Sequence, residues 1–166
     1  MNNSGIEKKI ELRKHFLGKK DNVLDMCCGD GVMYRECYKG KCASYMGLDL
    51  LGGRFAQNVL KYDSIDFVNK NGLYGCNFID IDPWGCFNQF YDAVMLAEKK
   101  DALKIICTDG GYYSAQKKGF SKQYYKSCLY KYCLEKAKKQ KYTLEDYICL
   151  DEQKMFYFGF FIRRLS

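Results

Sequence analysis

The residues best suited to chemistry lie in one short segment, Asn77–Gly85, which reads Asn-Phe-Ile-Asp-Ile-Asp-Pro-Trp-Gly. It contains the only proline and the only tryptophan of the 166 residues, side by side at the end of an apolar run. The run predicts a buried strand that Pro83 and Gly85 end, because proline lacks a backbone donor and glycine adopts unusual backbone angles. Ligands of open α/β sheets bind beyond the carboxyl ends of the strands. An acid, a rigid carbonyl and an indole would meet there, which suits a planar group that carries an amine. The alternative is a strand-ending turn whose tryptophan covers the core.

A glycine-rich turn follows an earlier predicted strand, Asn22–Met26, in the pattern Asp25-x-Cys27-x-Gly29-x-Gly31. Glycines let the backbone approach a ligand, and the amides at the start of the next helix are free to bind it. The turn is not a P-loop, since Gly-Lys-Ser/Thr does not occur in the sequence. A dinucleotide fingerprint would need a further glycine three residues after the last one.

Acids also end the next two predicted strands. Asp49 lies 18 residues after the last glycine of the turn, close to the spacing of roughly 20 for an acid that binds ribose hydroxyls. Asp63 could accept a hydrogen bond from an adenine amino group while Ile65 presses on the ring, or it could cap the helix that follows it. Four successive strand ends thus carry acids, which favours a ligand site over four unrelated turns.

The elements that must position these residues alternate between strands and helices, which predicts one doubly wound α/β domain over residues 1–166. The predicted strands are Asn22–Met26, Ser44–Leu48, Asn58–Tyr62, Cys76–Ile81, Leu103–Cys107, Thr143–Leu150 and Met155–Ile162. The predicted helices are Ile6–Phe16, Val32–Tyr38, Ser64–Lys70, Gln89–Lys100 and a lysine-rich helix after the fifth strand, with Gly52-Gly53 as a break in the chain.

The charge is concentrated in the segment Lys117–Lys141, which carries nine lysines and one acid in a chain of net charge +7. Lysines interleaved with aromatic residues suit nucleic acid, through phosphate neutralisation and base stacking. The segment could equally be a solvated helix with its tyrosines turned inward, because its apolar residues recur at helical spacing. Lys117, Lys118 and Lys122 precede this helix and should lie nearest the ligand crevice.

Composition excludes several classes of protein. Ten cysteines occur without a Cys-x-x-Cys pair and with a single histidine, so we expect no metal site. The polar N-terminus is unlike a signal peptide, and the longest apolar run, Met155–Ile162, is too short to span a membrane. We therefore expect a cytoplasmic protein with reduced cysteines and no membrane contact.

Together these segments resemble the motifs of class I S-adenosylmethionine-dependent methyltransferases. Val23–Gly31 resembles the first motif, Gly47–Asp49 the second and Asp63–Phe67 the third. Asp82–Gly85 resembles the fourth motif of enzymes that methylate exocyclic amines, where Asp/Asn-Pro-aromatic grips the base. The resemblance implies a Rossmann-like, mostly parallel seven-stranded sheet with helices on both faces and an antiparallel last strand. It also implies S-adenosyl-L-methionine as the cofactor.

A narrower likeness concerns tRNA (guanine-N2) dimethyltransferases. Ile79–Gly85, Phe90–Ala93 and Thr108-Asp109 are similar to the catalytic segment of those enzymes. This implies an exocyclic amine of an RNA base, guanine N2 in particular, as the methyl acceptor. Cys27 replaces the usual first glycine of the first motif, and the chain has no room for the large additional C-terminal domain of those enzymes. A partner subunit could therefore supply substrate recognition.

The resemblance also assigns roles to single residues. The Asp82 carboxylate and the Pro83 carbonyl would orient the amine, and Trp84 would stack on a base flipped out of any duplex. The cofactor would be bound by Asp25, Cys27, Gly29, Gly31, Asp49, Asp63, Ile65 and Asp80. The nucleic acid would be contacted by Gly85, Lys117, Lys118 and Lys122.

Other functions remain open at this point. One is a catalytically inactive nucleic-acid-binding protein with the same fold, although the acids are intact. Another is a DNA adenine or cytosine amino-methyltransferase, although no target-recognition region is apparent. A small-molecule or protein methyltransferase would make no use of the basic helix. A dehydrogenase is disfavoured by the incomplete dinucleotide fingerprint.

Overall fold

The computed structural model describes residues 4–51, 58–97, 100–152 and 154–165. Its seven strands form one sheet in the order β3-β2-β1-β4-β5-β7-β6. β1 to β5 are parallel, and β7 runs antiparallel to β5 and β6. The predicted doubly wound sheet is therefore confirmed. The strands are β1 (Asn22–Met26), β2 (Ser44–Asp49), β3 (Val59–Lys61), β4 (Phe78–Ile81), β5 (Ala102–Asp109), β6 (Tyr142–Glu152) and β7 (Met155–Arg164).

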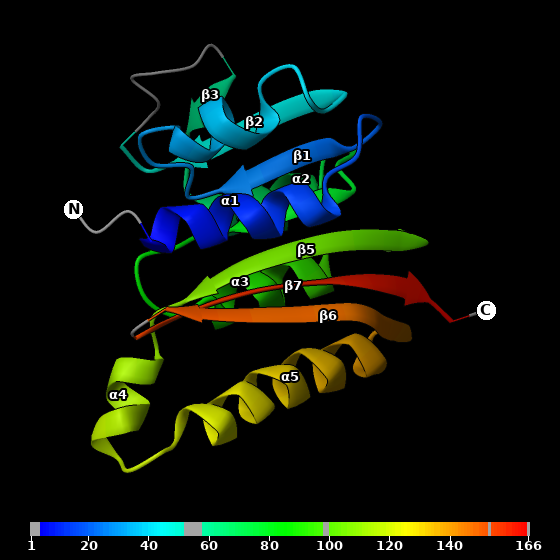
Figure 1. Ribbon diagram of the computed structural model, residues 1–166. Coiled ribbons are helices and arrows are strands. Elements are labelled where there is room, and N and C mark those ends of the chain that lie inside the picture. Colours follow the sequence, from blue (N-terminus) through cyan, green and yellow to red (C-terminus); the bar gives the residue numbers. More distant parts are fainter. Residues whose placement is uncertain (1–3, 52–57, 98–99, 153, 166) are drawn as a thin grey trace.

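Helices cover both faces of the sheet (Figure 1). They are α1 (Ser4–Phe16), the π-helical turn η1 (Tyr34–Tyr38), α2 (Ser64–Asn71), α3 (Asn88–Leu96), α4 (Tyr112–Lys117) and α5 (Lys122–Lys139). Residues of α1 and η1 pack in one core cluster, and residues of α2, α3, α4 and α5 pack in the other. In Figure 1, α1 crosses the front of the sheet while α2 and α3 lie behind it.

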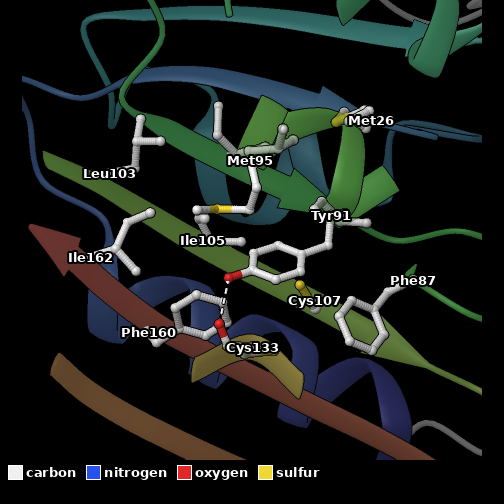
Figure 2. Close-up of a cluster of buried hydrophobic side chains, with 14 of the residues drawn as sticks. Met26, Phe87, Tyr91, Met95, Leu103, Ile105, Cys107, Cys133, Phe160 and Ile162 are labelled. Atoms are coloured by element: carbon white, nitrogen blue, oxygen red, sulfur yellow. Dashed lines mark hydrogen bonds between the residues drawn. The ribbon is translucent and has the colours of Figure 1, made fainter. Parts of the chain in front are cut away.

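The larger cluster is built around aromatic side chains (Figure 2). Tyr91 of α3 is fully buried among them, and its hydroxyl donates a 3.0 Å hydrogen bond to the Cys133 carbonyl of α5. Phe160 of β7 packs edge-on against the Tyr91 ring. Because a buried hydroxyl needs a partner, this bond fixes α3 against α5 over β5 and β7.

Alternation along β4 decides which of its side chains reach the site. Phe78 packs with the α1 cluster, whereas Ile79 and Ile81 pack with the larger cluster on the opposite face. Since strand side chains alternate between faces, Asp80 must point to the side of α1. It is fully buried there, so α1 has to supply its partner.

Three predictions of local structure need correction or completion. The lysine-rich helix is α5, and a short helix that was not predicted, α4, precedes it; Gly119, with a left-handed φ of 83°, lies between them. Lys117 and Lys118 precede α5 as predicted, whereas Lys122 is its first residue. The helix predicted at Val32–Tyr38 ends in the π-helical turn η1. The predicted break at Gly52-Gly53 lies outside the described residues.

No helix within the described ranges combines the length and the apolar character needed to cross a membrane.

Candidate active site

Backbone hydrogen bonds join the carboxyl ends of the parallel strands into one edge. Asp82 N donates to Met26 O at 3.3 Å, which brings the end of β4 to the glycine-rich turn. The amides of Cys27 and Cys28 both donate to Leu48 O, beside the end of β2. The segments predicted to form one site therefore meet, as expected for an edge that lies at a switch point of the sheet.

The glycine-rich turn has the open backbone that the sequence predicts. Gly29 and Gly31 have left-handed φ values of 50° and 67°, and a side chain added at Gly29 would meet nothing within 4 Å. Cys27 is left-handed as well, with a φ of 72°, in the position where the resembling motif has glycine. Burial raises the pKa of the Cys27 thiol to about 12, so it is not a nucleophilic thiolate at neutral pH.

Asp49 and Asp63 both bind backbone amides at this edge. Asp49 accepts from Gly29 N at 3.0 Å and from Leu51 N at 2.8 Å, one amide on each oxygen. Asp63 is the N-cap of α2 and accepts from Asp66 N at 2.9 Å through one oxygen. The capping role considered for Asp63 is thus present, and it uses only one of the two oxygens. Each carboxylate keeps acceptor capacity for a ligand.

Asp25 lies beneath the turn and not at the surface. Its side chain is almost fully buried and accepts a 2.9 Å hydrogen bond from the Tyr45 hydroxyl of β2. On the neighbouring strand β4, Asp80 is its register partner. Burial, and then the charge of Asp80, raises the pKa of Asp25 well above its ordinary value. Burial therefore favours the neutral form of Asp25.

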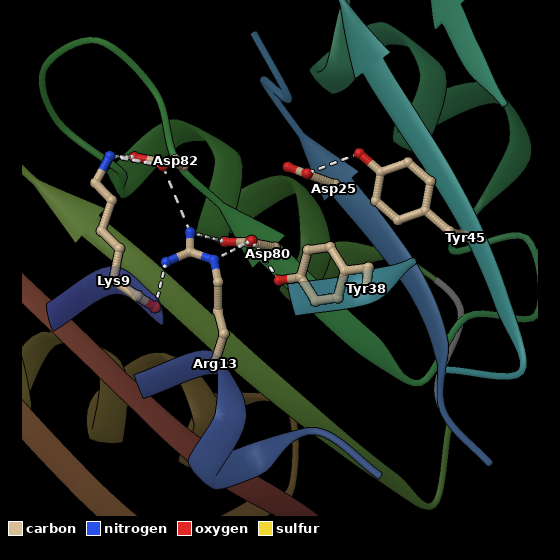
Figure 3. Close-up of polar contacts among 7 residues, drawn as sticks. All are labelled: Lys9, Arg13, Asp25, Tyr38, Tyr45, Asp80 and Asp82. Atoms are coloured by element: carbon tan, nitrogen blue, oxygen red, sulfur yellow. Dashed lines mark hydrogen bonds and ion pairs between the residues drawn. The ribbon is translucent and has the colours of Figure 1, made fainter. Parts of the chain in front are cut away.

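Arg13 of α1 is fully buried and binds Asp80 through two hydrogen bonds (Figure 3). Its Nε and Nη2 lie 2.6 Å from the two Asp80 carboxylate oxygens. The Tyr38 hydroxyl adds a 2.5 Å bond to the same carboxylate, and Arg13 Nη1 donates to the Lys9 carbonyl. Asp80, predicted to contact the cofactor, is fully buried and enclosed by these donors.

Asp82 faces two cations of α1, Lys9 and Arg13. Lys9 Nζ lies 2.7 Å from both of its oxygens, and Arg13 Nη2 lies 3.4 Å from one of them (Figure 3). About 16% of the Asp82 side chain is exposed. Burial alone would raise the pKa of Asp82, but the charges of Arg13 and Lys9 outweigh it and hold the pKa below its ordinary value. Asp82 is consequently an ionised acceptor at the edge of the site.

The turn after β4 presents an aromatic surface. Pro83 is buried, whereas Trp84 is fully exposed and so does not cover the core. Gly85 has a φ of 114°, which favours glycine, and its carbonyl accepts from Gly110 N at 2.8 Å. This bond ties the turn to the end of β5.

Thr108 and Asp109, at the end of β5, join this edge of the site. The Thr108 hydroxyl lies beside Asp82, and its hydrogen bond favours the ionised form of that carboxylate. The Asp109 carboxylate accepts from the Tyr125 hydroxyl, from Gly111 N and from Phe87 N. The end of β5 is thus linked both to Asp82 and to the segment after Gly85.

The candidate substrate lysines differ in their surroundings. Lys117 Nζ lies 4.4 Å from the centre of the Tyr113 ring in α4, and Lys118 ends that helix. Lys122 is paired with Asp151 of β6 at 3.0 Å, so part of its charge is already matched. α4 follows β5 directly and therefore lies at the same edge as the site (Figure 1).

Four residues of this site were not predicted from the sequence: Lys9, Arg13, Tyr38 and Tyr45. A signal for Arg13 existed, because it follows the buried Leu12 and stands one turn after Lys9 in an otherwise amphipathic helix. A basic residue beside the apolar stripe needs a buried acid as its partner. Which acid it meets depends on how α1 lies over the sheet.

Comparisons with known proteins agree on the fold. No protein-family model matches the sequence, and no curated protein matches it either. Among solved structures, TYW2 from M. jannaschii in complex with AdoMet is similar at 13% identity and a TM-score of 0.69, over 99% of this chain and 78% of that one. Trm1 from Pyrococcus horikoshii with S-adenosyl-L-methionine is similar at 13% identity and a TM-score of 0.72, over 98% of this chain and 55% of that one.

This chain has the fold of S-adenosylmethionine-dependent methyltransferases. A Lactococcus lactis protein described as a candidate hemolysin is also similar, at 11% identity and a TM-score of 0.68, over 99% of this chain and 88% of that one. The fold is thus shared by proteins described in different ways, and function has to be argued from the site.

Removing Arg13 should leave a buried charge unpaired. We expect Arg13→Met to lower the free energy of unfolding by about 3–5 kcal/mol, as is typical of a broken buried ion pair. Arg13→Met combined with Asp80→Asn should recover part of the lost free energy of unfolding, because the buried carboxylate is then replaced by a neutral amide. Urea unfolding of the wild type, both single variants and the double variant measures the coupling. Additive losses would contradict it.

Asp25 should make stability depend on pH. Its pKa is raised by folding, so the folded state keeps a proton that the unfolded chain releases above pH of about 3.9. Stability should therefore fall as pH rises above this value, by at most about 1.4 kcal/mol per pH unit. Asp25→Asn should remove this slope and be more stable than the wild type at pH 7. Urea unfolding between pH 4.5 and 7.5 tests this, and an unchanged slope would refute it.

Proposed function

We propose that this chain is an S-adenosyl-L-methionine-dependent methyltransferase that acts on an exocyclic amine of a nucleic-acid base, with RNA favoured over DNA and guanine N2 as one candidate acceptor. The observation that carries the proposal is the ionised Asp82 next to the glycine-rich turn and the exposed Trp84. We further propose that residues 1–166 act as a single domain.

The cofactor would lie over the joined ends of β1, β2 and β3. The open backbone at Gly29 would take the methionine portion, Asp49 the ribose, and Asp63 with Ile65 the adenine. Cys27 and Gly31, which also have left-handed backbone angles in this turn, would contact the cofactor as well. The similar structures of TYW2 and Trm1 contain this cofactor, which supports the assignment. Asp25 and Asp80 are buried and would support this surface from below.

Bound at this edge, S-adenosyl-L-methionine supplies an electrophilic methyl group on a sulfonium. The protein's part is then mainly positioning. An aromatic amine is a weak nucleophile, because its lone pair is delocalised into the ring. The Asp82 carboxylate and the Pro83 carbonyl would accept its two N–H groups and turn that lone pair toward the methyl group.

Recognition of the base would fall to the exposed aromatic and basic surface. Trp84 offers a free ring for stacking, and Lys117, Lys118 and Lys122 would contact phosphates near the same edge. Gly85 would let the nucleic acid approach the backbone. We also propose that a partner subunit extends this surface.

Changing Asp82 should separate chemistry from cofactor binding. We expect Asp82→Asn and Asp82→Ala to lower methyl transfer to RNA by about 100-fold or more, because the amine loses its charged acceptor. Affinity for S-adenosyl-L-methionine, measured by isothermal titration, should change little. Asp101→Asn, at an exposed position before β5, is the matched control. Turnover by Asp82→Ala at the wild-type rate would remove the mechanism.

The lysines near the site should give RNA binding a steep salt dependence. Each phosphate contact lowers log affinity by about 0.7–0.9 for every tenfold increase in salt. Replacing Lys117, Lys118 and Lys122 with Glu should weaken RNA binding and flatten this dependence, with cofactor affinity unchanged. Replacing Lys138 and Lys139 with Glu at the far end of α5 provides the control. If the triple variant binds RNA as well as the parent, the basic surface only aids solubility.

A further inference from the structure

The titratable groups around Asp82 come from four elements. They are Lys9 and Arg13 of α1, Asp25 and Cys27 at the end of β1, Asp80 of β4, and Tyr157 of β7. Tyr157 also lies under Lys9, whose Nζ is 5.9 Å from the ring centre. The described part of Asp82's surroundings thus contains two cations and several acids.

Two carboxylates in this group face two cations of α1. Asp80 faces Arg13, and Asp82 faces Lys9 and Arg13. Burial raises the pKa of Asp25, of the Cys27 thiol and of Tyr157, and so favours the neutral form of each. Each carboxylate lies within hydrogen-bond distance of a cation.

Asp82 can nevertheless exchange one of its weaker contacts for a substrate donor. An ionised carboxylate accepts about four hydrogen bonds. Lys9 uses one position on each oxygen at 2.7 Å, Arg13 approaches a third at 3.4 Å, and the Thr108 hydroxyl approaches the fourth. A substrate N–H can therefore bind Asp82 by replacing the long Arg13 contact or the Thr108 hydroxyl, without displacing Lys9, provided that it adds no charge.

We propose that Lys9 is a positioning residue that sets substrate specificity: by neutralising Asp82 it makes the site accept a neutral aromatic amine and exclude an alkylammonium ion. This rests on the proposed function and names the chemical class of its acceptor. An alkylammonium would be a third cation facing two carboxylates. It would also have to lose a proton before its nitrogen could attack a methyl group.

The proposal separates this site from one for lysine side chains or polyamines. Without Lys9, Asp82 would keep only the 3.4 Å contact with Arg13, and its exposed side would face no cation. Such a site would attract an alkylammonium as the Lys9 ammonium is attracted now. Arg13 would compensate only in part, because its two shorter bonds of 2.6 Å go to Asp80.

The test compares Lys9→Met and Lys9→Gln with Lys9→Arg, which keeps the charge, and with Lys14→Met on the exposed side of the same helix. The full chain, carrying ¹³C-labelled aspartate carboxyls, is titrated with guanosine and with n-butylamine while the Asp82 signal is followed by NMR. We expect Lys9→Met and Lys9→Gln to bind n-butylamine about tenfold more tightly than the wild type. Guanosine affinity should change far less, and the pKa of Asp82 should rise. Lys9→Arg and Lys14→Met should behave like the wild type.

Two results would overturn the proposal. One is unchanged n-butylamine affinity in both Lys9→Met and Lys9→Gln, and the other is a loss of selectivity in Lys9→Arg. These readouts need no methyl transfer. If charge selectivity follows Lys9 while no nucleic acid is ever methylated, the proposed function fails and the role of Lys9 in selectivity stands.

Discussion

Burying a guanidinium costs several kcal/mol unless a carboxylate and hydrogen bonds replace the water around it. The buried Arg13 of α1 has both kinds of partner on the sheet side of the helix. It binds Asp80 with both arms of a fork, and a third nitrogen donates to the carbonyl of Lys9 one turn earlier. Because guanidinium geometry is rigid, this contact fixes the position of α1 over β4. Lys9 is carried to Asp82 by the same constraint. The surroundings of Asp82 are therefore set by the Arg13–Asp80 ion pair, whose acid lies two residues earlier in the chain.

Backbone hydrogen bonds hold the rest of the site together. The ends of β4 and β1 are joined through Asp82 N and Met26 O, and the turn after β1 is anchored on Leu48 O of β2. These bonds leave the side chain of Asp82 free to face α1 while the glycine-rich turn faces outward. The charged acceptor and the proposed cofactor surface are thus adjacent yet built from different parts of the same edge.

Much of this arrangement could be predicted from the sequence. Apolar runs that end in acids predicted the parallel strands and their common edge. The spacing of apolar residues in a strand, and the residues that end it, can be read from the local sequence. The roles of buried acids could not be read in the same way. Asp25 and Asp80 follow the pattern of ligand-binding acids, yet both face inward, and only the placement of α1 shows that Arg13 encloses one of them. The short helix α4 before Gly119 was missed because six residues are too few to show a helical period.

The central claim is that Asp82, held ionised by α1, presents a neutral base amine for methylation. The most direct measurement is mass spectrometry of nucleosides from RNA and DNA incubated with the full chain and isotopically labelled S-adenosyl-L-methionine. The account predicts label on an exocyclic nitrogen of a base in RNA, with N2-methylguanosine as the leading candidate, and loss of that label in Asp82→Asn. Label confined to ribose, to a ring carbon or to protein lysines would contradict it.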